Sequence, residues 1–235
     1  MRYAIIEDEV FVLAPNFCRA VDIVEYIDNA IFSADLADRL QAIAAKYSNT
    51  VQCIAQPSLD AWDQVHRLFG SNPNRFPPSL KSLLKRAGSG RPLPFVNSAV
   101  AIMNTISLSN LIPCGGDDLG KVVGNLVLGV AKGTETFVPL GDGVAEHPDV
   151  GEVIYYDSAT GNVLCRRWNW RNGDVSKITS DTSSMLINID CLPPTHPEHL
   201  PEIQEELGGL LAQYCGASVQ FGLLHRDHRS FSLSA

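Results

Sequence analysis

The feature that most constrains the fold is a series of short apolar segments in the second half of the chain, each bounded by turn residues. Glycine, aspartate and asparagine between such segments are typical of strands joined by short connections. The connections are too short for a helical crossover, so the pattern favours a mainly antiparallel sheet. The predicted strands are Leu126–Val130, Phe137–Leu140, Val153–Asp157, Val163–Trp168 and Met185–Ile189.

Helical periodicity is found on both sides of this strand-rich region. Apolar residues recur every three or four positions, and Ser33 and Ser79 are placed as helix starts. The predicted helices are 33–44, 58–70, 79–88, 99–108 and 203–214, and extended runs are predicted at Phe11–Leu13, Ala20–Tyr26 and Val219–Leu224. We therefore predict an α+β fold, with one domain over residues 1–235 whose mostly antiparallel sheet is flanked by helices.

Composition limits the class of protein. The formal net charge of −8 argues against non-specific coating of nucleic acid, so no DNA partner is expected, although a local basic patch can still bind one RNA end. The six cysteines form no C-x-x-C pair, and no export signal or membrane span is recognised. These features predict a cytoplasmic protein with reduced thiols and no membrane partner.

Known cofactor and metal motifs are missing from the sequence. It holds no G-x-G-x-x-G, no Walker motif and no G-x-S-x-G elbow. His196 and His199 lie in a proline-rich loop without a third ligand, and His66 has no neighbour in sequence that would orient it. We therefore expect no cofactor and no metal, and a structural role for His66.

The residues from 163 to 171 combine arginines and tryptophans with an asparagine. Such side chains at a half-buried surface favour contact with a planar or anionic group, although arginine stems on an edge strand can also simply cover apolar neighbours. Asn104, in the middle of an apolar helix, is expected to have a structural hydrogen-bond partner. The segment Pro113–Leu119 is predicted as a tight turn in which Asp117 and Asp118 form a helix N-cap.

Taken together, these motifs resemble the B3/B4 domain, the tRNA-editing module of the phenylalanyl-tRNA synthetase beta subunit, and most of all its free-standing forms. Residues 96–192 carry the firm part of the resemblance, with 1–95 and 193–235 as extensions packed on that core. The matching pieces are Leu83–Arg86, Val96–Asn97, Asn104, Ser107, Pro113–Leu119, Gly133–Glu135, Gly151–Glu152, Asp157, Cys165–Arg171 and Ile178–Thr182.

The resemblance implies an aminoacyl-tRNA deacylase that acts in trans on the aminoacylated 3′ end of a mischarged tRNA. Gly115 and Gly116 are expected to supply oxyanion N–H groups, and Asn104 and Asn169 to orient water or substrate. The remaining candidates divide into two groups. Contacts with the amino acid and the terminal adenosine are assigned to Glu152 (the α-ammonium), Cys165, Arg167, Trp168, Arg171 and Asn188, and contacts with the rest of the tRNA to Lys81, Lys85, Arg86 and Arg91.

Two departures from the synthetase module bear on specificity. That module has a histidine where this chain has Gly115, and a glutamate that holds the tyrosine hydroxyl where this chain has Asn188. Tyrosine specificity is therefore not expected here. Two alternatives stay open: thiol catalysis through Cys114 or Cys165, and a binding module that holds the tRNA end or the amino acid without hydrolysis.

Overall fold

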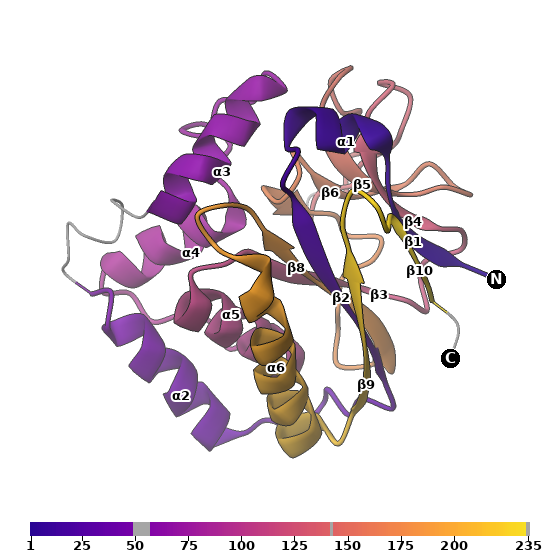
Figure 1. The fold of residues 1–235 in the computed structure, drawn as a ribbon. Helices are drawn as coiled ribbons and strands as arrows, with labels where there is room; N and C mark the ends of the chain where they lie inside the picture. Colours follow the sequence, from indigo (N-terminus) through magenta and orange to yellow (C-terminus); the bar gives the residue numbers. More distant parts are fainter. Residues whose placement is uncertain (49–56, 142, 234–235) are drawn as a thin grey trace.

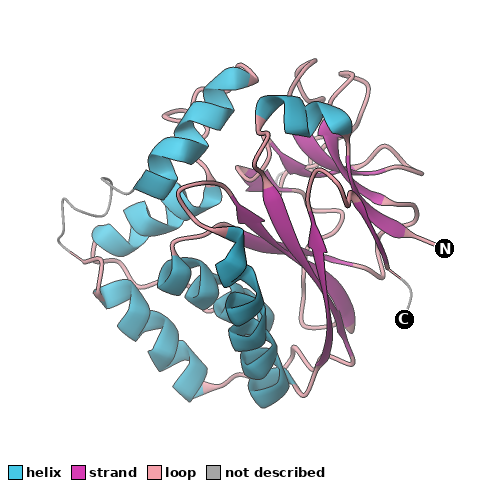
Figure 2. Ribbon diagram, viewed as in Figure 1, coloured by secondary structure: helices cyan, strands magenta, loops and turns pink. Residues whose placement is uncertain are grey.

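The computed structural model describes residues 1–48, 57–141 and 143–233 and arranges them in three layers (Figures 1 and 2). A six-stranded sheet with the order β10-β1-β4-β5-β6-β7 packs against a four-stranded sheet with the order β3-β8-β2-β9. Helices α2, α4, α5 and α6 lie on the far side of the four-stranded sheet, as Figure 2 shows in cyan against magenta. Within the described residues, no helix is long and apolar enough to cross a bilayer.

The bounds of the elements are as follows. The strands are β1 (Tyr3–Ile6), β2 (Cys18–Glu25), β3 (Cys114–Asp118), β4 (Leu126–Val130), β5 (Val153–Asp157), β6 (Val163–Arg166), β7 (Arg171–Asn172), β8 (Ser184–Cys191), β9 (Ser218–Leu224) and β10 (Ser230–Ser232). The helices are α1 (Asp8–Leu13), α2 (Ala34–Ala45), α3 (Pro57–Leu68), α4 (Ser79–Gly88), α5 (Ser98–Asn110) and α6 (Leu200–Cys215), with a 3₁₀ turn at Pro197–His199.

Two apolar cores hold the layers together, one on each side of the four-stranded sheet. On the helix side, Ile187 and Ile189 of β8 pack against apolar residues of α2, α4, α5 and α6. On the other side, Leu186 of β8 meets residues of both sheets, among them Leu128 and Leu164. Successive residues of a strand face opposite ways, so β8 contributes to both cores.

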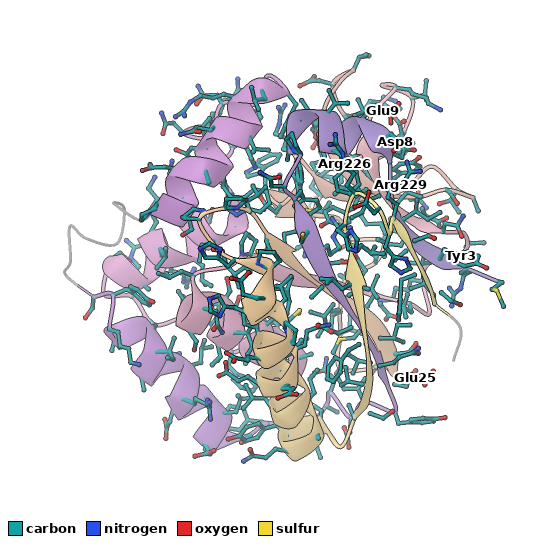
Figure 3. The ribbon with its side chains drawn as sticks, in the orientation of Figure 1. Tyr3, Asp8, Glu9, Glu25, Arg226 and Arg229 are labelled. Atoms are coloured by element: carbon teal, nitrogen blue, oxygen red, sulfur yellow. The ribbon has the colours of Figure 1, made fainter. Side chains whose placement is uncertain are left out.

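The chain ends share the six-stranded sheet. Strand β1 lies between β4, which runs parallel to it, and β10, which runs antiparallel, with Tyr3 opposite Ser232. Asp8 and Arg229 form an ion pair beside this junction, where Figure 3 shows their side chains close together. The β1–β4 pair is parallel; the other strand pairs in the described residues are antiparallel.

The predicted α+β class with a mostly antiparallel sheet is confirmed. Strands β4 and β5 have the predicted bounds, and the Ser33 hydroxyl accepts from the N–H of Leu36 at the start of α2, as expected of an N-cap. Three local predictions are wrong. Residues Phe11–Leu13 belong to helix α1, Phe137–Leu140 forms isolated bridges only, and Cys114–Asp118 is an edge strand rather than a turn.

Candidate functional site

A cavity opens where helices α4 and α5 approach strand β3 and the segment 169–178. Its outer part, the outer cavity, has a volume of about 610 Å³. A smaller space of about 80 Å³, the inner recess, reaches between the two sheets, to Tyr155 of β5 and Asp190 of β8. The two spaces adjoin each other and share seven lining residues: Ser79, Cys114, Gly115, Gly116, Asp117, Asn169 and Asn172.

Strand β3 brings the two glycines into this site. The N–H of Leu119 donates to the carbonyl of Ser184 (3.1 Å), and the register places Gly115 opposite Asn188. Hydrogen-bonded pairs alternate along an antiparallel ladder, so Gly115 is bonded to β8 while the N–H of Gly116 points away from β8, at the edge of the sheet. The two glycines therefore differ: the sheet uses the N–H of Gly115, and the N–H of Gly116 faces outward.

The space around the two glycines differs as well. A Cβ added at Gly115 would meet no atom within 4 Å, whereas one added at Gly116 would lie 2.7 Å from the Leu186 carbonyl oxygen. Glycine at 116 is thus required by close backbone approach. Glycine at 115 leaves open a part of the cavity that a side chain would fill.

Asp117 and Asp118 hold the loops around β3. Asp117 lines both parts of the site and accepts a hydrogen bond from the Ser176 hydroxyl (2.6 Å). Burial raises the pKa of Asp117 to about 6, against the lowering effects of Ser176 and of Arg19. Asp118 accepts from the Thr182 hydroxyl (2.8 Å) and from the N–H of Gly120 (2.9 Å). The predicted helix N-cap is wrong, because β3 leads into a turn rather than into a helix.

The chain reverses direction after β6. Arg167 and Trp168 are left-handed, with φ values of 47° and 64°, which is uncommon outside glycine. This reversal turns the Trp168 ring inward, where it is fully buried and packs edge-on against Phe17 and Trp62 with centroids 5.0 and 5.5 Å away. It also places Asn169 on the wall of the cavity.

A buried ionic network forms the floor of the inner recess. The guanidinium of Arg19 donates to Asp190 (2.9 Å) and to the hydroxyl of Tyr155, which itself donates to Asp190 (2.8 Å). The Trp168 indole N–H donates to the same carboxylate (3.2 Å). Because three donors surround Asp190, its charge is compensated within the protein.

Two side-chain amides on the recess wall have buried atoms without partners. Asn169 Oδ1 lies 3.2 Å from Nε2 of the fully buried His66, and Asn169 Nδ2 has no partner. Asn188 Oδ1 also has none. Burial lowers the pKa of His66 to about 4, so the ring is neutral at pH 7. Because Asn169 Oδ1 can only accept, the hydrogen bond between them requires the proton on Nε2.

Residues 61–216, more than half of the chain, match the B3/4 domain family. The chain belongs to the B3/4 domain family. No curated protein matches it. A crystal structure of an N-terminal fragment of the phenylalanyl-tRNA synthetase beta subunit from Pyrococcus horikoshii is similar at 14% identity and a TM-score of 0.45, covering 91% of this chain. The chain spans about half the length of that fragment, since 49% of it is covered.

The cavity of this B3/4 domain brings together most of the residues predicted for catalysis and amino-acid binding. The outer cavity is lined by Asn104, Gly115, Gly116, Asn169, Arg171 and Arg86, and the inner recess by Gly115, Gly116, Cys165, Trp168, Asn169 and Asn188. Other candidates lie elsewhere in the described structure, outside the residues that line either space: Glu152, Arg167, Lys81, Lys85 and Arg91.

Glu152 and Arg167 are held in ion pairs away from the cavity. Glu152 is buried, receives two hydrogen bonds from Arg166 (2.9 and 2.7 Å) and accepts from the backbone N–H of Arg167 (2.9 Å). The guanidinium of Arg167 donates to Asp149 (2.6 Å) and stacks on the ring of Phe76 at 3.9 Å. The expected contacts of Glu152 with an α-ammonium and of Arg167 with the terminal adenosine phosphate are corrected: both side chains stabilise the turn after β6.

The predicted tRNA-binding cations are not equivalent. Lys81 is 12% exposed and paired with Asp63 at 2.7 Å, so it stabilises the packing of α4 on α3. Arg86 is exposed and lines the outer cavity, whereas Lys85 and Arg91 are exposed beyond it. Of the four, Arg86 is the one that stands at the cavity.

The expectation of a structural partner for Asn104 is wrong. Its side chain is half-buried, lines the outer cavity and makes no hydrogen bond within the described residues. It therefore faces the cavity as a polar group that remains available to a ligand.

The cysteines at the site are in an environment unsuited to a thiolate. Burial and the charges of Asp22 and Asp190 raise the pKa of Cys114 well above its ordinary value, and burial with the charge of Asp117 does the same for the pKa of Cys165. The described cysteines are free thiols, and Cys53 lies outside the described residues. The geometry thus disfavours the thiol mechanism.

Sequence reasoning missed several residues of the site. Asp190, Tyr155 and Arg19 form the recess floor, and Trp170, which the sequence left without a role, lines the outer cavity and packs on Phe76 with centroids 4.7 Å apart. One signal was available: Asn188 and Asp190 lie two positions apart within an apolar strand. Such spacing places both on one face, so two polar groups there indicate a buried polar site.

Proposed function

We propose that this B3/4 domain hydrolyses the ester between an amino acid and the 3′ end of a mischarged tRNA. The sequence resemblance to the synthetase editing module motivates the reaction class. The observation that carries it is a pair of adjoining spaces, of which the inner one is small and lined in part by polar side chains, and the outer one is wide. An aminoacyl ester on a terminal nucleotide has the matching shape: a small amino acid joined to a larger planar nucleoside.

The carbonyl oxygen is proposed to meet the N–H of Gly116. An ester of this kind is already reactive, so the enzyme needs chiefly to position water and to stabilise the oxyanion that forms. The edge position of β3 leaves the Gly116 N–H directed away from the sheet, at a residue that lines both spaces. Gly115, whose N–H the ladder uses, is proposed instead to leave room for the substrate.

Asp117 takes the role first assigned to Glu152, that of binding the α-ammonium. Its side chain stands where the recess joins the outer cavity, and with a pKa of about 6 it is mainly ionised at pH 7. An ammonium group beside it favours the ionised form further. Asn104, which lacks a protein partner, is proposed to orient the attacking water from the outer cavity.

The tRNA end is proposed to lie across the outer cavity. Trp170 is half-buried there and offers a face for base stacking, while Arg86 and Arg171 stand near enough to the opening to meet phosphate. The net charge of −8 is compatible with this arrangement because only the 3′ end, rather than the whole tRNA, requires cations. Lys85 and Arg91 are proposed to contact the tRNA beyond the cavity.

The test is incubation of the protein with a panel of mischarged tRNAs, with release of free amino acid as the readout. We expect release that persists in the presence of a chelator and after thiol alkylation. Loss of release with chelator would contradict the water-based mechanism. Binding of a charged tRNA without release from any member of the panel would instead favour a binding module.

A matched pair of variants links any release to the cavity. Gly115→Val places a branched side chain in the open space at that position, so we expect at least a tenfold loss of kcat/KM with the fold retained. Ser109→Ala, on the exposed side of α5, is the control and should behave as the wild type. Equal rates in both variants would place the reaction elsewhere on the molecule.

A further inference from the structure

The inner recess has two features that distinguish it from an apolar packing void. It has room for several non-hydrogen atoms, about 80 Å³, and two of the residues that line it each bury one amide atom without a partner, Asn169 Nδ2 and Asn188 Oδ1. The two asparagines are 9% and 7% exposed. Most buried polar atoms in native proteins are hydrogen-bonded, so an unpaired donor and an unpaired acceptor in one small space indicate a group that is bound there.

We infer that the recess binds the end of a small, uncharged amino-acid side chain that both donates and accepts a hydrogen bond, namely a hydroxyl or a carboxamide. Asn169 Nδ2 donates to this group, and Asn188 Oδ1 accepts from it. This inference rests on the proposed function in one respect only: the side chain is taken to belong to an amino acid esterified to an adenosine.

His66 holds the donor in place. Its neutral ring donates from Nε2 to Asn169 Oδ1 (3.2 Å), and this hydrogen bond leaves Nδ2 as the free end of the amide. The histidine is fully buried, so the ring cannot exchange this partner for solvent. His66 is thus a positioning residue, since it acts on the ligand through Asn169 rather than by contact.

The charges around the recess exclude an anionic side chain. Asp117 and Asp190 line it, and Asp190 already has Arg19, Tyr155 and Trp168 as donors. No lysine or arginine is among the described residues that line the recess. A carboxylate there would face two acidic groups and would offer no proton to Asn188 Oδ1.

The inference can be tested by binding, without any turnover. The probes are adenosines that carry an aminoacyl group in amide linkage at the 3′ position, titrated by calorimetry. Threonyl and valyl probes have nearly the same shape and differ by the hydroxyl, and asparaginyl and aspartyl probes differ by charge. We expect the threonyl and asparaginyl probes to bind at least tenfold more tightly than their counterparts, since a site built for a hydrogen bond rejects an analogue that leaves its polar atoms unpaired.

Three variants assign the preference to the recess. Asn188→Ala and Asn169→Ala should each reduce the threonyl-to-valyl ratio to below threefold. His66→Leu should reduce the ratio as well, although Asn169 itself is unchanged, and melting curves show whether each variant is folded. Ser82→Ala, at an exposed position on the outer cavity, is the control and should keep the wild-type ratio.

The outcomes separate this inference from the proposed function. Discrimination between the probes without hydrolysis of any charged tRNA would overturn the hydrolase and leave the recess assignment intact. Hydrolysis without discrimination would overturn the recess assignment, as would equal binding of all probes. A structure with the threonyl probe that shows only ordered water between Asn169 and Asn188 would overturn it as well.

Discussion

The two faces of strand β8 bury side chains of different kinds. Toward the helices, Ile187 and Ile189 sit in an apolar core, with 0% exposure each. Toward the other sheet, Asn188 and Asp190 occupy the middle of the strand and line the inner recess. Both faces are buried, yet one is stabilised by apolar packing, whereas the other holds the Asp190 ionic network beside amide atoms that have no partner. We therefore expect the two faces to differ in how much each side chain contributes to stability.

Loss of the central carboxylate should have the largest effect on stability. Asp190→Ala leaves the Arg19 guanidinium buried without its counter-ion, so we expect the free energy of unfolding to fall by about 3–5 kcal/mol, measured by urea denaturation. Combining Asp190→Leu with Arg19→Met removes both charges and should restore part of the loss. A loss below about 1 kcal/mol in Asp190→Ala would show that water reaches the Arg19 guanidinium despite its burial.

The two faces can be compared directly at neighbouring positions. Ile187→Ala empties a filled space in the helix-side core and should cost about 2–5 kcal/mol. Asn188→Ala removes a side chain that makes no hydrogen bond within the described residues, so its cost should stay below about 1 kcal/mol. Both values come from the same urea titrations. Equal costs would mean that Asn188 stabilises the fold after all.

His66, which is hydrogen-bonded to Asn169 at the inner recess, should make the free energy of unfolding depend on pH. Its pKa is about 4 in the folded protein, against about 6.5 in the unfolded chain, so the unfolded chain binds the proton more tightly. The contribution of His66 to the free energy of unfolding is fully present above about pH 6.5. It decreases by up to about 3 kcal/mol as the pH falls toward 4.

The comparison with His66→Gln isolates this effect, because Asp22 and Asp117 act in the opposite direction. Burial raises the pKa of Asp22 to about 7 and that of Asp117 to about 6. The contribution of each carboxyl group to the stability of the folded protein therefore decreases as the pH rises above about 4. The wild type should therefore lose more stability than the variant between about pH 6.5 and about pH 4.5. Parallel curves would contradict a buried, neutral His66.

The smallest effect on stability is expected at Asn104. Because its side chain faces the outer cavity without a protein partner, Asn104→Ala should change the free energy of unfolding by less than about 0.5 kcal/mol. Its kcat/KM on a mischarged tRNA should fall at least tenfold. A large loss of stability would restore the structural role that the apolar helix first indicated.

The sequence predicts the fold best where pattern and packing agree. Leu126–Val130 and Val153–Asp157 are apolar runs between turn residues, and both are strands with those bounds. Phe11–Leu13 is a short apolar run, and in so short a run periodicity cannot distinguish a strand from a helix. Cys114–Asp118 carries two glycines and two aspartates, so local propensity disfavours a strand, and pairing with β8 overrides it.

The candidate site was predictable in its motif residues but not in its support. Asn104, Gly116 and Asn169 come from matched motifs, and the structure brings them to one cavity. Arg19 and Asp190 lie far apart in sequence, and nothing local marks them as partners. Contacts of that kind arise from the packing of two sheets, which no single segment encodes.

The pairing of β1 with β10 also decides how the molecule responds to force. The outer ends of these two strands lie together, with Tyr3 opposite Ser232, and the strands run antiparallel from there. Tension applied across the two termini therefore loads the hydrogen bonds of this ladder one after another, beginning with the bond from the Leu233 N–H to the Arg2 carbonyl. Hydrogen bonds loaded in series open like a zipper, whereas those loaded in shear must break together. The six-stranded sheet should accordingly peel from its β10 edge at low force.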